Sequence, residues 1–125
     1  MKATELQIGD WVFIKDYPIK ALPQKVKPEH FVRSLVEFEP IPLEKIHLTK
    51  NGFEAREETD DTEFYYYDSY EINVSFDEGI SEENIPPIIF LTIEFAEKSI
   101  AMPIEYVHEL QQAMRIMGCD KEIEL

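Results

Sequence analysis

Apolar and polar residues alternate along several short segments of the chain, and this period of two is typical of β-strands with one buried face. The alternation is most regular over 70–76, where Tyr70, Ile72, Val74 and Phe76 share one side. By the same pattern we expect further strands on both sides of Gly9-Asp10 and at 31–38, 53–56, 64–68, 99–102 and 122–125. The proline-containing stretch 17–28 is predicted as a loop, with a short edge strand at 21–26 as the alternative.

A different apolar pattern marks 88–95. This segment begins with the uninterrupted run Ile88-Ile89-Phe90-Leu91, which is typical of a strand buried on both faces. We therefore predict that 88–95 is a central strand. Acidic loops are predicted on either side of the neighbouring strands, at 57–63 and 77–84.

Steps of three and four between apolar residues predict one long helix, at 104–117. Its stripe consists of Ile104, Val107, Leu110, Met114 and Met117. Pro103 is a suitable first residue, and Gly118 is a stop signal. A shorter helix is predicted at 43–50, opened by Pro42 and ended by Asn51-Gly52, with Leu43 and Ile46 on its apolar side.

These elements predict an α+β fold in a single domain, 1–125. We expect a curved, mainly antiparallel sheet of about six or seven strands packed against one C-terminal helix. A chain of 125 residues with 44% hydrophobic residues can bury a core of its own. The one cysteine, Cys119, allows no intrachain disulfide. With no apolar run near the ~20 residues of a membrane helix, we expect a cytoplasmic protein without membrane association.

The charge is unevenly distributed. The net charge is −14; residues 1–50 hold eight basic and seven acidic residues, whereas residues 51–125 hold four and nineteen. Because affinity for nucleic acid comes largely from lysine and arginine on phosphates, this balance predicts no direct binding to nucleic acid.

No motif in the sequence indicates a catalytic, metal or cofactor site. His108-Glu109 begins like a zinc-protease helix, but the second ligand position holds Gln112. His30 and His47 have no ligand spacing to His108, and the acidic run 57–63 lacks the residue order of a helix-loop-helix calcium site. We expect no metal and no cofactor. Catalytic groups can nevertheless converge from distant positions, so a small enzyme stays open as a third class.

Four residues are candidates for binding a protein partner: Tyr65, Tyr67, His108 and Gln111. On a strand, Tyr65 and Tyr67 point one way while Phe64 and Tyr66 point the other. One of these sides belongs to the core, and an exposed tyrosine ridge beside acidic residues would form a binding patch.

Three segments together resemble a group of small uncharacterised proteins of Bacteroides-type bacteria, often associated with prophages or other mobile elements. The segments are Leu6-Gln7-Ile8-Gly9-Asp10-Trp11-Val12, Pro40-Ile41-Pro42-Leu43 with Asn51-Gly52-Phe53, and Tyr106-Val107-His108-Glu109-Leu110-Gln111. The first segment is also similar to first strands of small SH3-like barrels, which implies a partly closed sheet as an architectural option. Neither resemblance implies an activity.

Two non-catalytic functions follow as hypotheses. The first is an accessory protein of a mobile element that binds another protein. The alternative is an acidic mimic of nucleic acid that inhibits a host DNA-binding protein, because nineteen carboxylates lie in 51–125. A homodimer through a sheet edge is a further open arrangement.

Overall fold

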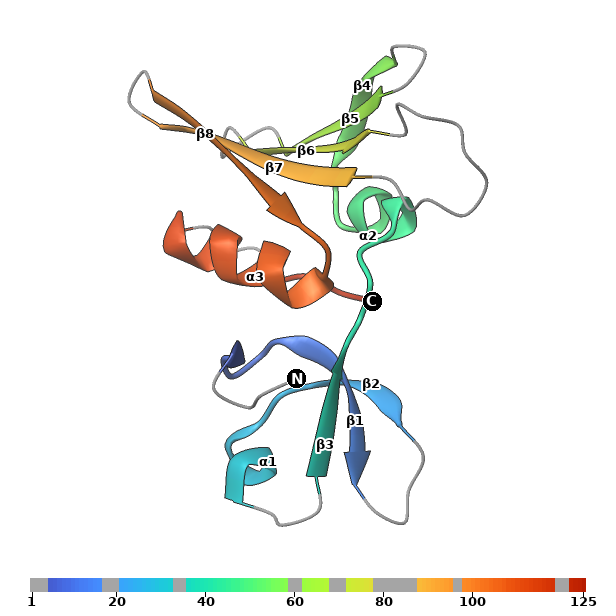
Figure 1. Ribbon diagram of the computed structural model, residues 1–125, viewed down its shortest axis with the longest axis vertical. Helices are drawn as coiled ribbons and strands as arrows, with labels where there is room; N and C mark the ends of the chain where they lie inside the picture. Colours follow the sequence, from blue (N-terminus) through green and yellow to red (C-terminus); the bar gives the residue numbers. More distant parts are fainter. Residues whose placement is uncertain are drawn as a thin grey trace. The chain divides into compact units, whose positions relative to one another are not determined.

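The computed structural model describes residues 5–16, 21–32, 36–58, 62–67, 72–77, 88–95, 98–118 and 122–125. Its backbone contacts group into two compact units (Figure 1). Unit 1 comprises Met1–Leu43, Tyr106–Ile123 and Leu125, and unit 2 comprises Glu44–Glu105 and Glu124. Unit 2 is thus inserted between two stretches of unit 1 in the sequence. Two such units can still unfold together, so the single domain stays a prediction.

The α+β class and the mainly antiparallel pairing are confirmed, but the prediction of one sheet is wrong. The described strands form two open antiparallel sheets, of three and five strands, and they close no barrel. The SH3-like option therefore gains no support. Residues 41–44, which include Pro42, separate β3 from α2 and divide the two sheets along the chain.

Unit 1 contains the three-stranded sheet, with β1 (Trp11–Asp16) between β2 (Leu22–Lys25) and β3 (Val36–Pro40). Val12 and Ile14 of β1 point into a core that also contains Leu6 and Val26. The loop predicted over 17–28 is wrong at 22–25, where the alternative, a short edge strand, is present as β2. Because β2 is at the edge, the missing N–H of Pro23 removes no hydrogen bond to a second neighbouring strand.

Two strand predictions in unit 1 are wrong. Residues 6–10 form a turn rather than a strand, since the Asp10 N–H donates to the Gln7 carbonyl (3.1 Å). The start of the strand predicted at 31–38 lies in α1 (Pro28–Val32), a helix that Pro28 can open because its missing N–H is not needed there. Only the end of that predicted strand was placed correctly, in β3.

Unit 1 also contains the C-terminal helix α3 (Val107–Ile116), which contacts β1. The helix begins three residues later than predicted, because Pro103 and Ile104 belong to a strand of unit 2 and pair with Phe90 and Ile89 there. Gly118 has a φ of 76°, so the predicted helix stop is confirmed.

Unit 2 is a five-stranded meander in the order β4-β5-β6-β7-β8. The strands are β4 (Glu54–Glu58), β5 (Thr62–Tyr67), β6 (Ile72–Asp77), β7 (Ile88–Phe95) and β8 (Lys98–Ile104). The bounds of β7 are those predicted. Its internal position, between β6 and β8, is also as predicted, although β6 is the middle strand of the five. The predicted burial on both faces is wrong, because buried residues such as Ile89 alternate with less buried ones such as Ile88.

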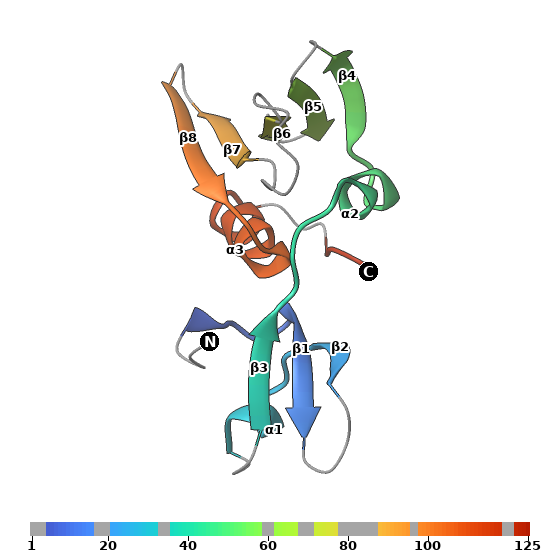
Figure 2. The same cartoon turned by 45° about the vertical axis from the view of Figure 1, so that its right-hand side comes forward.

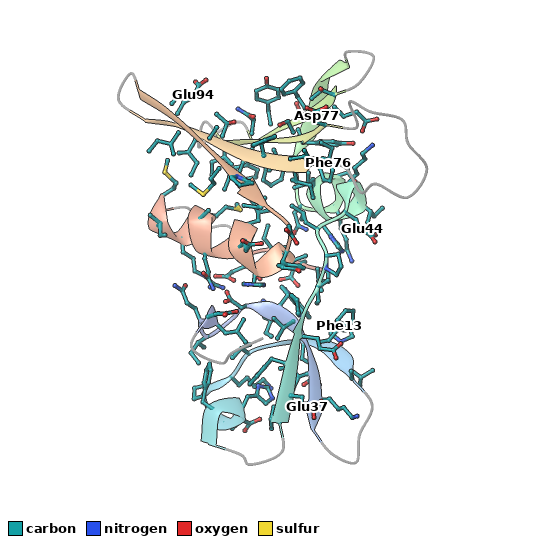
Figure 3. The ribbon with its side chains drawn as sticks, viewed as in Figure 1. Phe13, Glu37, Glu44, Phe76, Asp77 and Glu94 are labelled. Atoms are coloured by element: carbon teal, nitrogen blue, oxygen red, sulfur yellow. The ribbon has the colours of Figure 1, made fainter. Side chains whose placement is uncertain are left out.

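The sheet of unit 2 has one buried face, which we call the inner face, and an opposite outer face. Ile72, Val74 and Phe76 of β6 point to the inner face, as predicted, while Asp77 points to the outer one (Figure 3). The short helix α2 (Lys45–Lys50) lies on the inner side of the sheet (Figures 1 and 2), with the Lys45 ammonium 5.8 Å from the Phe76 ring centroid.

Details of α2 and the C-terminus differ from prediction. Pro42 lies outside the helix, in an isolated bridge with Tyr106, and α2 begins at Lys45. The helix buries Leu48, whereas Ile46 is exposed. Residues 122–125 form no strand. Instead the Asn51 side chain pairs with the Glu124 backbone, donating to its carbonyl and accepting from its N–H (both 2.7 Å).

Some predicted features lie outside the described residues. They are Tyr70, Asp68, Cys119, residues 59–61 of the first acidic loop and 78–84 of the second. No helix of the described ranges is long and apolar enough to cross a membrane.

Candidate functional site

Tyr65 and Tyr67, two of the four predicted partner-binding residues, lie on the inner face. Tyr65 is 6% exposed and meets the Phe76 ring edge-to-face at a centroid distance of 5.8 Å. The half-buried Tyr67 packs on Phe53 at 5.2 Å. These contacts are those of core residues and give no support to a role in partner binding.

The Tyr65 hydroxyl is held by a polar group at the margin of this core. It donates a hydrogen bond to Glu63 Oε2 (2.9 Å), which also forms an ion pair with Lys45 of α2 (2.8 Å). The hydrogen bond from Lys45, followed by that from Tyr65, lowers the pKa of Glu63 below its ordinary value of 4.5. Glu63 thereby links β5 to α2.

Phe64 and Tyr66 of β5 point to the opposite side and, like Tyr67, are half-buried. Phe64 and Tyr66 lie on the outer face with their rings stacked at 6.5 Å. The strand register places Ser75 beside Phe64 and Phe90 beside Ser75, so Phe90 extends the same row. The described residues therefore form no ridge of exposed tyrosines; instead a half-buried row of Phe64, Tyr66 and Phe90 lies on the face opposite to Tyr65 and Tyr67.

Carboxylates surround this aromatic row. Glu54 is opposite Tyr66, Asp77 is opposite Ile88, and Glu94 is exposed on the same face (Figure 3). The described outer-face positions of β5 to β8 carry no lysine or arginine; they are Thr62, Phe64, Tyr66, Asn73, Ser75, Asp77, Ile88, Phe90, Thr92, Glu94, Ser99, Ala101 and Pro103. We call this surface the outer aromatic face.

His108 and Gln111, the other two candidates, are buried on α3, at 5% and 3% exposure. Gln111 Nε2 donates to the Gly9 carbonyl (3.0 Å), and its Oε1 accepts from the Trp11 N–H (2.8 Å). Both ends of the amide are therefore satisfied by the backbone around Asp10. Gln111 holds the turn before β1 against the helix, which is a structural role.

Asp10 lies at the centre of this polar cluster and is completely buried. Its carboxylate accepts hydrogen bonds from the Gln7 N–H (2.8 Å) and Gln112 Nε2 (2.7 Å), and it forms an ion pair with Arg115. A buried charge is tolerated when its oxygens are saturated in this way. This cluster was not predicted from the sequence, although Gln112 and Arg115 lie beside His108 on the same side of a helix.

His108 Nδ1 is the buried side-chain atom without a hydrogen-bond partner in the described residues. Its ring stacks on Tyr106 at 5.8 Å, with 9° between the planes. Burial lowers the pKa of His108 below 6.5, against the opposing charges of Asp10, Glu109 and Glu5. Burial thus favours the neutral form of the ring.

The other two histidines cap helices. His30 Nδ1 accepts the Lys27 N–H and His47 Nδ1 accepts the Glu44 N–H, each at 3.0 Å and each three residues on from its donor. This is the geometry of a capping box with histidine as the acceptor. It explains these histidines without a metal, and no group of three metal-ligating side chains occurs in the described ranges.

Comparison with known proteins adds no relative: no family model matches the chain, and no curated protein or solved structure matches it significantly. We therefore infer the function from the surfaces of the chain itself.

Proposed function

We propose that the chain is a non-enzymatic accessory protein of a mobile element or prophage and acts by binding another protein. The outer aromatic face carries this proposal. The mobile-element context comes from the resemblance of the three sequence segments.

The composition of the outer aromatic face suits a protein interface. Aromatic side chains that are already fixed in a sheet lose little conformational entropy on binding, and they are enriched among residues that dominate binding energies. Phe64, Tyr66 and Phe90 supply this apolar centre. No described helix of unit 2 covers it (Figure 2).

The surrounding charges indicate the chemistry of the partner. With Glu54, Asp77 and Glu94 on this face, a surface with lysine or arginine around an apolar centre would be complementary. The partner is therefore expected to present a basic surface, and raising the salt concentration should weaken the complex.

A photo-crosslinking experiment tests the proposal. A photoreactive amino acid replaces Tyr66 on the outer aromatic face or, as the matched control, Tyr65 on the inner face, and the protein is irradiated in extracts of the source cells. One defined adduct is expected from position 66 and none from position 65. Tyr66→Ser should lower capture of that partner more than tenfold, whereas Leu22→Ser, at a 50% exposed residue of β2, should not.

Two results would contradict the proposal: capture that is unchanged by Tyr66→Ser, or a substrate screen that finds turnover while no partner is captured. Release of the captured partner by duplex DNA would favour the alternative, an acidic mimic of nucleic acid.

A further inference from the structure

Strand β8 forms one end of the five-stranded sheet (Figure 1), and in the described residues it pairs with β7 alone. Its residues Ser99 to Met102 are all exposed, with Ile100 at 57% and Met102 at 36%. From Ser99 to Ile104 the strand carries no charge, in a chain of which 30% is charged. Ser99, Ala101 and Pro103 also border the outer aromatic face, whereas Ile100 and Met102 belong to the inner face.

Sheet edges of this kind bind other strands unless something prevents it. An edge strand presents a row of backbone N–H and C=O groups, and proteins commonly protect it with charges, prolines or bulges. In β8 the charged residue is Lys98 at the start, and Pro103 removes one donor near the end. The stretch between them has neither form of protection.

The order of residues in β8 is complementary to itself. If two copies pair antiparallel about Ala101, Ile100 of each copy lies opposite Met102 of the other, and Ser99 lies opposite Pro103. Ile100 and Met102 share a side with Ile93 and Leu91 of the inner face, as the β7 register shows. The two apolar pairs would then continue the apolar face across the junction, and cross-strand pairs of this kind stabilise sheets.

We propose that β8 pairs antiparallel with β8 of a second copy of this chain, centred on Ala101, to join the two five-stranded sheets. A second copy is favoured over an unrelated strand because this register brings no two like charges opposite each other between Ser99 and Ile104. The inference is independent of the proposed function.

Salt distinguishes this association from the partner complex. Each copy carries a net charge of −14, so the two copies repel each other through solvent. Screening shortens the range of that repulsion from about 30 Å at 0.01 M salt to about 3 Å at 1 M. The dimer should therefore become stronger with added salt, whereas binding of a basic partner should become weaker.

Sedimentation velocity over a range of protein concentrations tests the proposal with the full chain at both salt concentrations. Wild type is expected to show a reversible monomer–dimer equilibrium that shifts to dimer at high salt. Ile100→Lys and Met102→Glu should each weaken it at least tenfold, because each buries a charge opposite an apolar residue. Their equimolar mixture should dimerise again, since the ammonium introduced in one variant then faces the carboxylate introduced in the other.

Leu22→Lys, on the edge strand β2 of the other sheet, is the matched control and should dimerise like wild type. Circular dichroism confirms that each variant is folded. The proposal is overturned if wild type stays monomeric throughout, if neither β8 substitution weakens the dimer, or if the mixture fails to restore it.

Discussion

Arg115 of α3 forms an ion pair with Asp10, whose carboxylate is completely buried in the turn before β1. The two residues are 105 positions apart in the sequence. The pair therefore joins the first and last parts of unit 1. Since the side chain of Arg115 is 26% exposed while that of Asp10 is 0% exposed, the consequences of losing either partner are unequal.

Arg115→Met should destabilise the protein strongly, because it leaves the Asp10 carboxylate buried without its cation. Removing one partner of a buried pair costs about 3–5 kcal/mol. The lower end applies here, since Gln112 Nε2 and the Gln7 N–H still donate to Asp10. Urea unfolding measures the loss. Asp10→Asn should lower the free energy of unfolding less than Arg115→Met does. The double variant should lower it by clearly less than the sum of the two single losses. Losses that add exactly would show that the two residues are not energetically coupled.

Gln111→Leu should destabilise unit 1 by leaving the Gly9 carbonyl and the Trp11 N–H without partners. An unsatisfied buried polar group costs about 1–3 kcal/mol. Gln112→Leu removes a bond to Asp10 and provides a comparison on the same helix, where the remaining donors limit the loss. Unchanged urea midpoints for Gln111→Leu would mean that water replaces the amide.

Removing the titratable group of His108 should alter the pH dependence of stability. The pKa of His108 is lowered in the folded protein, so the unfolded chain takes up the proton first as the pH falls below about 6.5. The stabilising contribution of the neutral ring is present above that pH and is lost as the pH falls through the folded pKa. His108→Met, which cannot titrate, should lose less stability than wild type between pH 7 and pH 5, measured by urea unfolding at each pH.

His47→Gln provides a second test of the same kind. Glutamine can still accept the Glu44 N–H that caps α2, so stability at pH 7 should change little. The pKa of His47 is also lowered, mainly by burial, so this variant should change the pH dependence of stability with the same sign. Equal pH dependences in wild type and His108→Met would contradict the burial of a neutral ring.

The pKa of Glu63 should respond to both of its partners. Lys45→Met should raise it more than Tyr65→Phe, because the hydrogen bond from Lys45 is the largest cause of its lowering and that from Tyr65 comes second. Carboxyl carbon shifts in an NMR titration measure both values. An unchanged pKa in Lys45→Met would show that the ion pair is not formed in solution.

Local periodicity was sufficient to predict much of the chain. The alternation of Ile72, Val74 and Phe76 placed β6 and its buried side correctly, and Gly118 marked the end of α3. Local signals failed where long-range pairing decided the outcome. Pro103 looks like a helix start, yet it lies opposite Phe90 in an edge strand, and no feature of the local sequence reveals that ladder.

The candidate site shows the same division between local and long-range information. Alternation correctly separated Tyr65 and Tyr67 from Phe64 and Tyr66, but which side faces the core depends on where α2 and β6 pack. A role of His108 and Gln111 in partner binding would require both residues to be exposed on the helix. They are buried because the turn at Gly9 and Asp10 docks on that side of α3, a contact between residues about a hundred positions apart.

Gly9→Ala should destabilise unit 1 more than Gly118→Ala, although both glycines have positive φ values, 92° and 76°. The conformational cost to an alanine is similar at the two sites, about 1–2 kcal/mol. A Cβ at Gly118 meets no atom of the described residues within 4 Å, whereas a Cβ at Gly9 lies 3.1 Å from Arg115 Nη2. The arginine would have to move away from Asp10, so part of the ion-pair energy is lost as well. When Arg115 is replaced by methionine, Gly9→Ala and Gly118→Ala should therefore lower the urea midpoint by more similar amounts. If the two substitutions still differ as much as they do in the wild-type background, the contact with Arg115 is not the cause of the difference.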